Sequence, residues 1–202
     1  CGGTGSGKTT LLNILGCFID NIDRIITIED AAELKLHQEH VISLETRTVS
    51  YGVGNEVTIR DLVRNALRMR PDRIIVGECR GKEAFDMLQA MNTGHDGSLT
   101  TIHANGVIDA LNRLETLVLM SGLEIPIRAV REYIVNAIDI VINIERMSDG
   151  KRKITNISEI IGLKDGEIEL NPIFEFVQSG LTDTKEVSGS FKMSNKRPRI
   201  LD

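Results

Sequence analysis

The chain has 202 residues, of which 41% are hydrophobic and 26% are charged, with a net charge of -5 at pH 7. This length suffices for one sizeable hydrophobic core and a small appendage, but not for two full α/β domains. No apolar run approaches the ~20 residues that a membrane span needs, and the acidic balance argues against nucleic-acid binding. Its cysteines, Cys1, Cys17 and Cys79, show neither metal-ligand nor disulfide spacing, so we expect a soluble protein of the reducing cytoplasm.

The chain opens on a glycine-rich loop that matches the pattern Gly-x-x-x-x-Gly-Lys-Thr over residues 2–9. Glycines let successive backbone N–H groups point at phosphate oxygens, the lysine contacts the β- and γ-phosphates, and the threonine hydroxyl ligates Mg²⁺. We therefore predict a P-loop ATPase with ATP and Mg²⁺ as cofactors and Thr9 as a metal ligand. The residues predicted to bind the nucleotide are Gly3, Thr4, Gly5, Ser6, Gly7, Lys8, Thr9 and Thr10.

A phosphate-binding loop normally connects a buried β-strand to a helix. Residues 8–15 have the pattern of that helix, whereas the strand would have to lie before Cys1. We therefore expect the chain to be the carboxy-terminal piece of something longer. We also expect the 202-residue chain alone to bind ATP weakly.

The next predicted element is a buried strand over residues 25–28, a short apolar and β-branched run. An acidic cluster, Glu29, Asp30 and Glu33, follows it directly. If this cluster faces a crevice at the strand end, Glu33 would polarise the attacking water. Asp30 and Glu33 also resemble a capping box that opens a short helix, and the two interpretations can coexist. Residues 35–57 are polar and predict an irregular connection.

Thr58 opens a predicted helix that ends at Pro71, and the strand 74–76 then delivers Gly77 and Glu78 at its carboxyl end. A P-loop ATPase needs a carboxylate on a neighbouring strand to hold Mg²⁺ or its water, or to orient the attacking water. Glycine stands where an aspartate is usual, so Glu78 is the first catalytic candidate and contacts the metal through water. A solvated surface role is the alternative.

Two histidines flank the next strand. A helix over residues 82–92 is followed by His95, and the strand 99–102 carries His103 at its tip. Zinc binding is disfavoured because no cysteine and histidine pair at zinc spacing. We favour γ-phosphate sensors, with a buried, satisfied histidine as the alternative.

A helix over residues 107–120 and another beginning near Pro126 lead to a predicted strand at 138–144. Strands and helices alternate up to this point, which predicts an α/β core with a mainly parallel sheet covered by helices. Short strands then follow at 154–161 and 168–177. We divide the chain into a core, residues 1–147, and a β-rich appendage, residues 148–202, that ends in a basic, poorly ordered stretch.

Taken in this order, the segments resemble the secretion ATPase superfamily, the motors of type II and type IV secretion and of pili. The marks beyond the phosphate loop are an acidic box, a glycine-glutamate Walker B and a histidine box, at residues 28–34, 76–80 and 94–103. Further runs are most similar to the CpaF/TadA-type ATPases of Tad (Flp) pilus assembly, at residues 44–47, 65–73, 98–105 and, more loosely, 173–180. The resemblance covers nearly the whole chain and departs at the start, where the family's amino-terminal domain, linker and P-loop strand are missing.

The resemblance implies a RecA-like core in a cytoplasmic homo-hexamer, peripheral at the inner membrane, that hydrolyses ATP at subunit interfaces. The motion would drive an inner-membrane platform protein in pilus assembly or protein secretion. By position, the implied roles are nucleotide and Mg²⁺ binding by Lys8 and Thr9, catalysis by Glu33 and Glu78, membership of the histidine box for His95 and His103, and an arginine finger at Arg47 or Arg80. For either arginine, a solvated surface position is the alternative.

Two other functions remain open at this stage. A RecA-like ATPase acting on DNA would share the same core, although the acidic charge and the 3% aromatic content argue against it. A nucleotide-binding fragment without activity is the other, because the loop lacks its preceding strand, and we expect the chain alone not to form the active hexamer.

Overall fold

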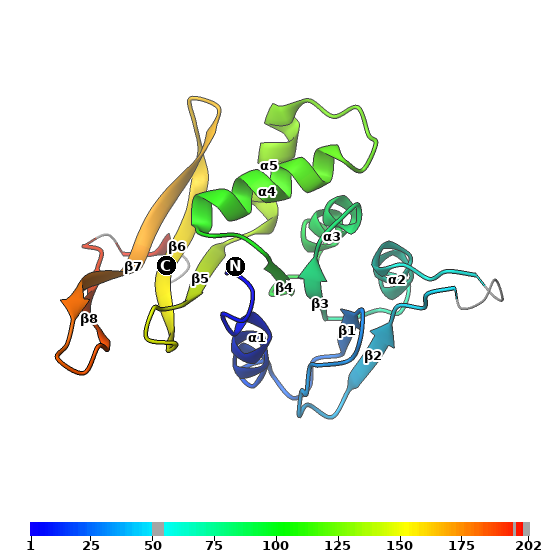
Figure 1. The fold of residues 1–202 in the computed structure, drawn as a ribbon. Helices are drawn as coiled ribbons and strands as arrows, with labels where there is room; N and C mark the ends of the chain where they lie inside the picture. Colours follow the sequence, from blue (N-terminus) through cyan, green and yellow to red (C-terminus); the bar gives the residue numbers. More distant parts are fainter. Residues whose placement is uncertain (50–54, 196, 200–202) are drawn as a thin grey trace. The chain divides into compact units, whose positions relative to one another are not determined.

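The computed structural model describes residues 1–49, 55–195 and 197–199 (Figure 1). These residues form two compact units. The first contains Thr9–Ile102 and Leu117–Leu123, and the second contains Cys1–Lys8, His103–Thr116 and the described part of residues 124–202. None of the helices in these described ranges is long and apolar enough to cross a membrane.

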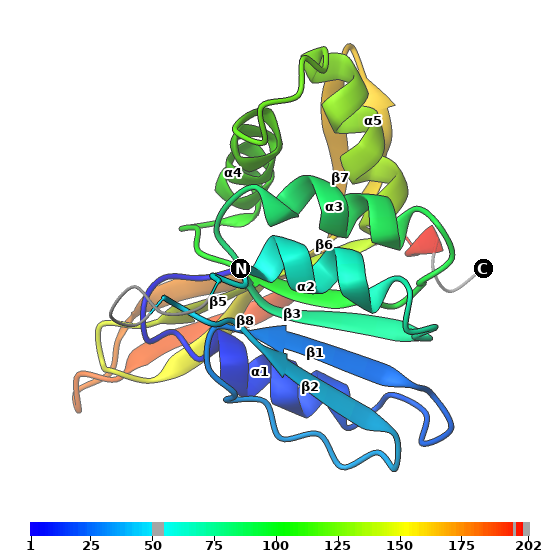
Figure 2. The same cartoon turned by 90° about the vertical axis from the view of Figure 1, so that its right-hand side faces the viewer.

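The first unit is built on a parallel sheet with the strand order β2-β1-β3-β4. The strands are β1 (Ile25–Glu29), β2 (Val41–Glu45), β3 (Arg73–Cys79) and β4 (Leu99–Ile102). Every residue of β1 is buried, as expected for a central parallel strand covered on both faces. The helix α1 (Lys8–Gly16) lies on one face, and α2 (Ile59–Ala66) and α3 (Glu83–Met91) lie on the other (Figure 2).

The helix α2 confirms the start predicted at Thr58. The Thr58 hydroxyl accepts a hydrogen bond from the Asp61 N–H, and the Asp61 carboxylate accepts one from the Thr58 N–H. The Thr58 hydroxyl also donates to the Asp61 carboxylate at 2.7 Å, and this bond, with the one from the Thr58 N–H, lowers the pKa of Asp61. The helix ends at Ala66, earlier than predicted, and Arg70 takes a left-handed φ of 53° before Pro71, which disfavours a helical residue in front of it.

The connection after β1 differs from the prediction in two ways. Residues 41–45, expected to be irregular, form the edge strand β2, paired in parallel with β1 from Val41 to Glu45. Its residues are half-buried or exposed, so the sequence there lacks the continuous apolar run of a central strand. No helix forms between β1 and β2, and the alternative of an Asp30 capping box is therefore wrong. Residues 50–54 of this predicted connection lie outside the described residues.

The second unit combines helices with an antiparallel sheet of order β5-β6-β7-β8. Its elements are α4 (Val107–Leu119), whose last turn belongs to the first unit, α5 (Ile127–Ala137), β5 (Ile140–Arg146), β6 (Arg152–Lys164), β7 (Glu167–Leu181) and β8 (Val187–Met193). The strand β5 covers most of the predicted strand at residues 138–144, and a tight turn at residues 147–151 folds β6 antiparallel onto it. The boundary at residue 147 stays a prediction, since the compact units group β5 with the later strands.

Candidate functional site

The phosphate loop lies in the second unit and has the backbone that anion binding needs. Gly5 and Gly7 have φ values of 69° and 98°, a left-handed region that favours glycine. The loop leads directly into α1 at Lys8, whose Nζ donates a hydrogen bond to the Gly3 carbonyl at 3.0 Å. An ammonium group therefore lies against the loop backbone.

The start of the loop is held on both sides by backbone pairing within the second unit. The Cys1 nitrogen donates to the Ile142 carbonyl at 2.6 Å, and the Ile144 N–H donates to the Cys1 carbonyl at 3.0 Å. This alternation is the pattern of parallel strands. On the other side, Gly2 forms a parallel bridge with His103. The structure thus places His103 beside the beginning of the phosphate loop.

The Ser6 side chain indicates whether the loop can bind a phosphate. Its hydroxyl is buried, with the residue 1% exposed, and has no hydrogen-bond partner among the described residues. A buried polar atom without a partner is costly, and a phosphate oxygen is one group that can accept its hydrogen. The loop residues therefore fit an oxyanion, with backbone amides, an ammonium and hydroxyl groups as its donors.

The acidic cluster lies in the first unit, at the carboxyl edge of the parallel sheet. Arg80 forms ion pairs with two carboxylates at this edge. The Arg80 guanidinium contacts Glu78 at 2.6 Å and Asp30 at 3.5 Å. The hydrogen bond and charge of Glu78, with smaller contributions from the charges of Asp30 and Glu33, raise the pKa of Arg80 above its usual value. The Arg80 side chain is 61% exposed, and an exposed ion pair contributes little to stability. These ion pairs therefore add little to the stability of the fold.

A bulge in β3 determines how Glu78 leaves the sheet. The pairing of β3 with β4 shifts register between Val76 and Cys79, and a bulge of this kind re-aims the side chains beside it. The buried Thr101 hydroxyl donates to the Gly77 carbonyl at 2.6 Å inside this irregular stretch. Sequence analysis did not single out Thr101, because a threonine within a strand has the ordinary character of a strand residue.

We expect Thr101→Val to lower the free energy of unfolding by about 1 to 3 kcal/mol, because it leaves the Gly77 carbonyl without this donor at nearly constant side-chain volume. Denaturant unfolding measures the change. Thr100→Val is the matched control, since the Thr100 hydroxyl donates only to the neighbouring carbonyl, at 3.4 Å. Equal stability of the two variants would contradict the assigned role of Thr101.

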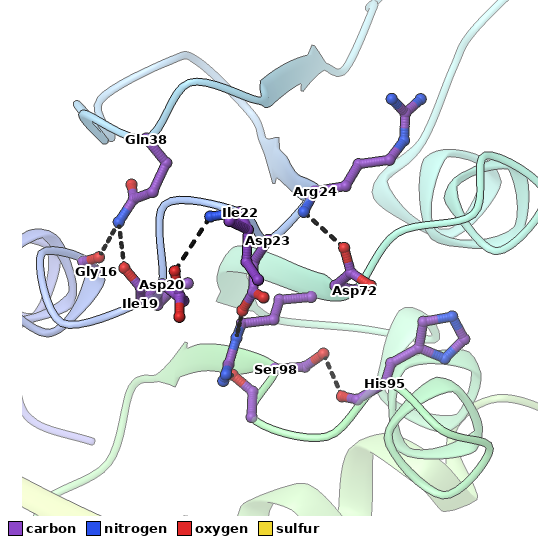
Figure 3. Close-up of polar contacts among 12 residues, drawn as sticks. Gly16, Ile19, Asp20, Ile22, Asp23, Arg24, Gln38, Asp72, His95 and Ser98 are labelled. Atoms are coloured by element: carbon purple, nitrogen blue, oxygen red, sulfur yellow. Dashed lines mark hydrogen bonds and ion pairs between the residues drawn. The ribbon is translucent and has the colours of Figure 1, made fainter.

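The structure does not bring His95 to the carboxyl edge of the parallel sheet, where the acidic cluster lies. His95 follows α3, where its Nδ1 lies 3.0 Å from the Ala90 carbonyl and its own carbonyl accepts from Ser98 (Figure 3). It precedes β4, so it lies at the amino edge of the parallel sheet, whereas Glu78 lies at the carboxyl edge. The two histidines therefore lie at opposite ends of β4, and the role of both as phosphate sensors stays a prediction.

Glu33 and Arg47 lie on exposed segments after β1 and β2. Arg47 forms an antiparallel bridge with Val57, and its side chain donates to the Asn55 carbonyl at 3.1 Å. The preceding residue, Thr46, donates its N–H to the Glu29 carbonyl, which fixes this strand end beside β1. The carboxyl edge thus presents Glu33, Glu78, Arg80 and Arg47 from three neighbouring strand ends.

Comparison with known proteins identifies relatives that agree with one another in family. The family described as "Type II/IV secretion system protein" matches residues 1–163. A putative conjugal transfer protein of Mycobacterium tuberculosis is 39% identical over 184 residues, covering 91% of this chain and 51% of the relative. The type IV secretion system protein VirB11 of Bartonella henselae is 40% identical over 158 residues, covering 77% of this chain and 44% of the relative.

A solved structure agrees with these relatives. The VirB11 ATPase of the Brucella suis type IV secretion system, in complex with sulphate, aligns with a TM-score of 0.70 at 36% identity, covering 78% of this chain and 46% of that one. The chain spans about half the length of the curated relatives it matches. Because the family matches residues 1–163 and a relative is 39% identical over 91% of this chain, the chain belongs to the type II/IV secretion system protein family.

Proposed function

We propose that this chain is the ATP-hydrolysing part of a type II/IV secretion or pilus motor. The observation that carries the proposal is the phosphate loop, with its left-handed glycines, the Lys8 ammonium against its backbone and the buried Ser6 hydroxyl without a partner. The Brucella suis relative was solved with sulphate, a tetrahedral oxyanion like phosphate, which supports an oxyanion site in the family. Residues 3–10 would hold the phosphates of ATP, and Thr9 would hold Mg²⁺.

Bound Mg²⁺ neutralises charge that develops on the phosphates, and the protein supplies positioning and electrostatics. We assign to Glu33 the polarisation of the attacking water. Glu78 would orient the same water or hold a water of the metal. His103, paired through its backbone with Gly2, is the better sensor candidate, whereas the position of His95 gives that role no support.

The two arginines differ in what they already contact. Arg80 is bound to Glu78 of its own chain at 2.6 Å, so we propose that it shapes the acidic cluster within one subunit. Arg47 is exposed, and among the described residues its side chain donates to one backbone carbonyl, that of Asn55. We therefore favour Arg47 as the candidate for a γ-phosphate on a neighbouring subunit.

The assembly is proposed from the resemblance. The subunits would form a homo-hexamer at the cytoplasmic side of the inner membrane and drive a platform protein. The runs at residues 44–47, 65–73 and 98–105 favour Tad (Flp) pilus assembly within this family.

Phosphate release by the full-length protein tests this function against a DNA-directed ATPase. We expect hydrolysis of Mg²⁺-ATP at a rate that single-stranded or duplex DNA leaves unchanged, and a hexameric mass in the presence of nucleotide. Hydrolysis stimulated by DNA, together with salt-sensitive DNA binding, would contradict the motor assignment.

A further inference from the structure

Glu29, the last residue of β1, has a buried carboxylate and is not one of the proposed catalytic residues. The residue is 5% exposed, and among the residues that the structure describes no lysine, arginine or histidine forms an ion pair with it. Its partners are backbone amides. Oε1 accepts from the Glu33 and Leu34 N–H groups at 3.1 Å each, and Oε2 accepts from Leu34 at 3.4 Å.

These bonds act on the segment that carries Glu33. Buried carboxylates are costly unless such charge-assisted bonds compensate them, so the carboxylate and the amides are mutually dependent. The segment is anchored further along by α1, where Asn13 accepts from the Lys35 N–H at 2.8 Å. Gln38 then donates to the carbonyl of Gly16, the last residue of α1, and to that of Ile19 in the following turn (Figure 3). Of these anchors, only Glu29 acts at Glu33 itself.

The same side chain also fills the space beside Gly77. A Cβ added at Gly77 would lie 2.9 Å from Glu29 Cγ, closer than packed carbon atoms tolerate, and 3.4 Å from Glu29 Oε1. This contact gives a physical reason for glycine directly before Glu78, at the position where an aspartate is usual. One buried carboxylate therefore touches the segments of both proposed catalytic acids, Glu33 by hydrogen bonding and Glu78 through its neighbour.

We propose that Glu29 is a positioning residue, which fixes the Glu33 backbone and the spacing between the Glu33 and Glu78 segments. The inference rests on the proposed ATPase function. Catalytic groups must be held within about 0.5 Å of their productive geometry, and a misplacement of about 1 Å can cost about 10²-fold in rate. Loss of Glu29 should therefore lower turnover and spare nucleotide binding, because the phosphate loop is a separate segment.

The test compares Glu29→Ala, Glu29→Gln, Gly77→Ala and the double variant Glu29→Ala/Gly77→Ala in the full-length protein, by kcat, KM and nucleotide Kd. Glu29→Ala should lower kcat by about 10- to 100-fold with Kd unchanged. Glu29→Gln should restore most of kcat, because an amide oxygen still accepts both N–H groups. Gly77→Ala should lower kcat in the parent. In the Glu29→Ala background it should lower kcat little further, because the clash is gone.

Glu45→Gln is the matched control, since Glu45 is exposed and pairs in register with Glu29.

Amide hydrogen exchange gives a readout that does not depend on activity. Protection of the Glu33 and Leu34 amides should fall in Glu29→Ala and persist in Glu29→Gln and Glu45→Gln. Parental kcat in Glu29→Ala, or equal losses in Glu29→Ala and Glu29→Gln, would overturn the positioning role. An inactive parent would instead overturn the proposed function, and unchanged protection in Glu29→Ala would then overturn this inference as well. If Glu29→Ala does not fold, Glu29→Gln and Gly77→Ala still decide between these outcomes.

Discussion

Replacing Lys8 with alanine is expected to weaken ATP binding by about 10- to 100-fold, the equivalent of one or more charge-assisted hydrogen bonds. The Lys8 ammonium now donates to the Gly3 carbonyl at 3.0 Å, so it already lies against the loop that would surround the phosphates. Its removal leaves the backbone amides and hydroxyl groups in place but takes away the positive charge. Titration of the full-length protein with a fluorescent ATP analogue measures the affinity.

The control for this experiment is another lysine changed to alanine. Lys164, the last residue of β6, is exposed, and its replacement should leave the dissociation constant for ATP unchanged. Circular dichroism of both variants separates a loss of binding from a loss of folding. Parental ATP affinity in a folded Lys8→Ala protein would show that the loop does not bind the phosphates.

Replacing Glu78 with glutamine is expected to leave ATP binding within a few-fold of the parent and to lower kcat by about 10²- to 10⁴-fold, the usual contribution of a general acid or base. Glutamine keeps the size of the side chain and an oxygen that can accept from Arg80, whose distance to Glu78 is 2.6 Å. It loses the negative charge and the basicity. Steady-state phosphate release and nucleotide titration, performed on the same preparation, measure the two effects separately.

Glu45→Gln serves as the comparison for Glu78→Gln, because Glu45 ends the strand β2 at the same carboxyl edge of the parallel sheet. It should retain the parental kcat. If Glu78→Gln weakens ATP binding as strongly as turnover, Glu78 would be a binding residue. If it matches Glu45→Gln in turnover, its assignment as a catalytic acid is wrong.

Three of the four strands of the parallel sheet could be predicted from residue types alone. Residues 25–28, 74–76 and 99–102 all form predicted strands, within β1, β3 and β4. Residues 25–28 and 74–76 are buried and mostly apolar and β-branched, so their pattern can be recognised without knowledge of the neighbouring strands. The start of α2 at Thr58 was equally local, because its capping box involves only residues three apart.

The features that the sequence did not specify depend on distant partners. The edge strand β2 is half exposed and is defined by its pairing with β1, which residues 41–45 do not reveal on their own. The strand β5 was predicted, but its antiparallel pairing with β6 depends on its neighbours. The place of His95 at the amino end of β4 depends on the direction in which that strand runs in the sheet.

In the candidate site, too, local features could be predicted from the sequence and features that depend on distant segments could not. The phosphate loop and the acidic strand ends follow from residue types at short spacing, so the sequence was sufficient to nominate Lys8, Glu33 and Glu78. The roles of Glu29 and Thr101 depend on hydrogen bonds to backbone groups of other segments. A buried glutamate at the end of an apolar strand was the one signal available for Glu29.

The most direct test is magnesium-dependent phosphate release from ATP by the full-length protein, with Lys8→Ala and Glu78→Gln measured beside it. We expect release by the parent that stops on chelation of Mg²⁺, release by Lys8→Ala only at higher ATP concentrations, and ATP binding by Glu78→Gln with turnover lowered by about 10²- to 10⁴-fold. No magnesium-dependent release by the folded parent, or parental release by both variants, would contradict the assignment of this chain as the ATP-hydrolysing part of a secretion motor.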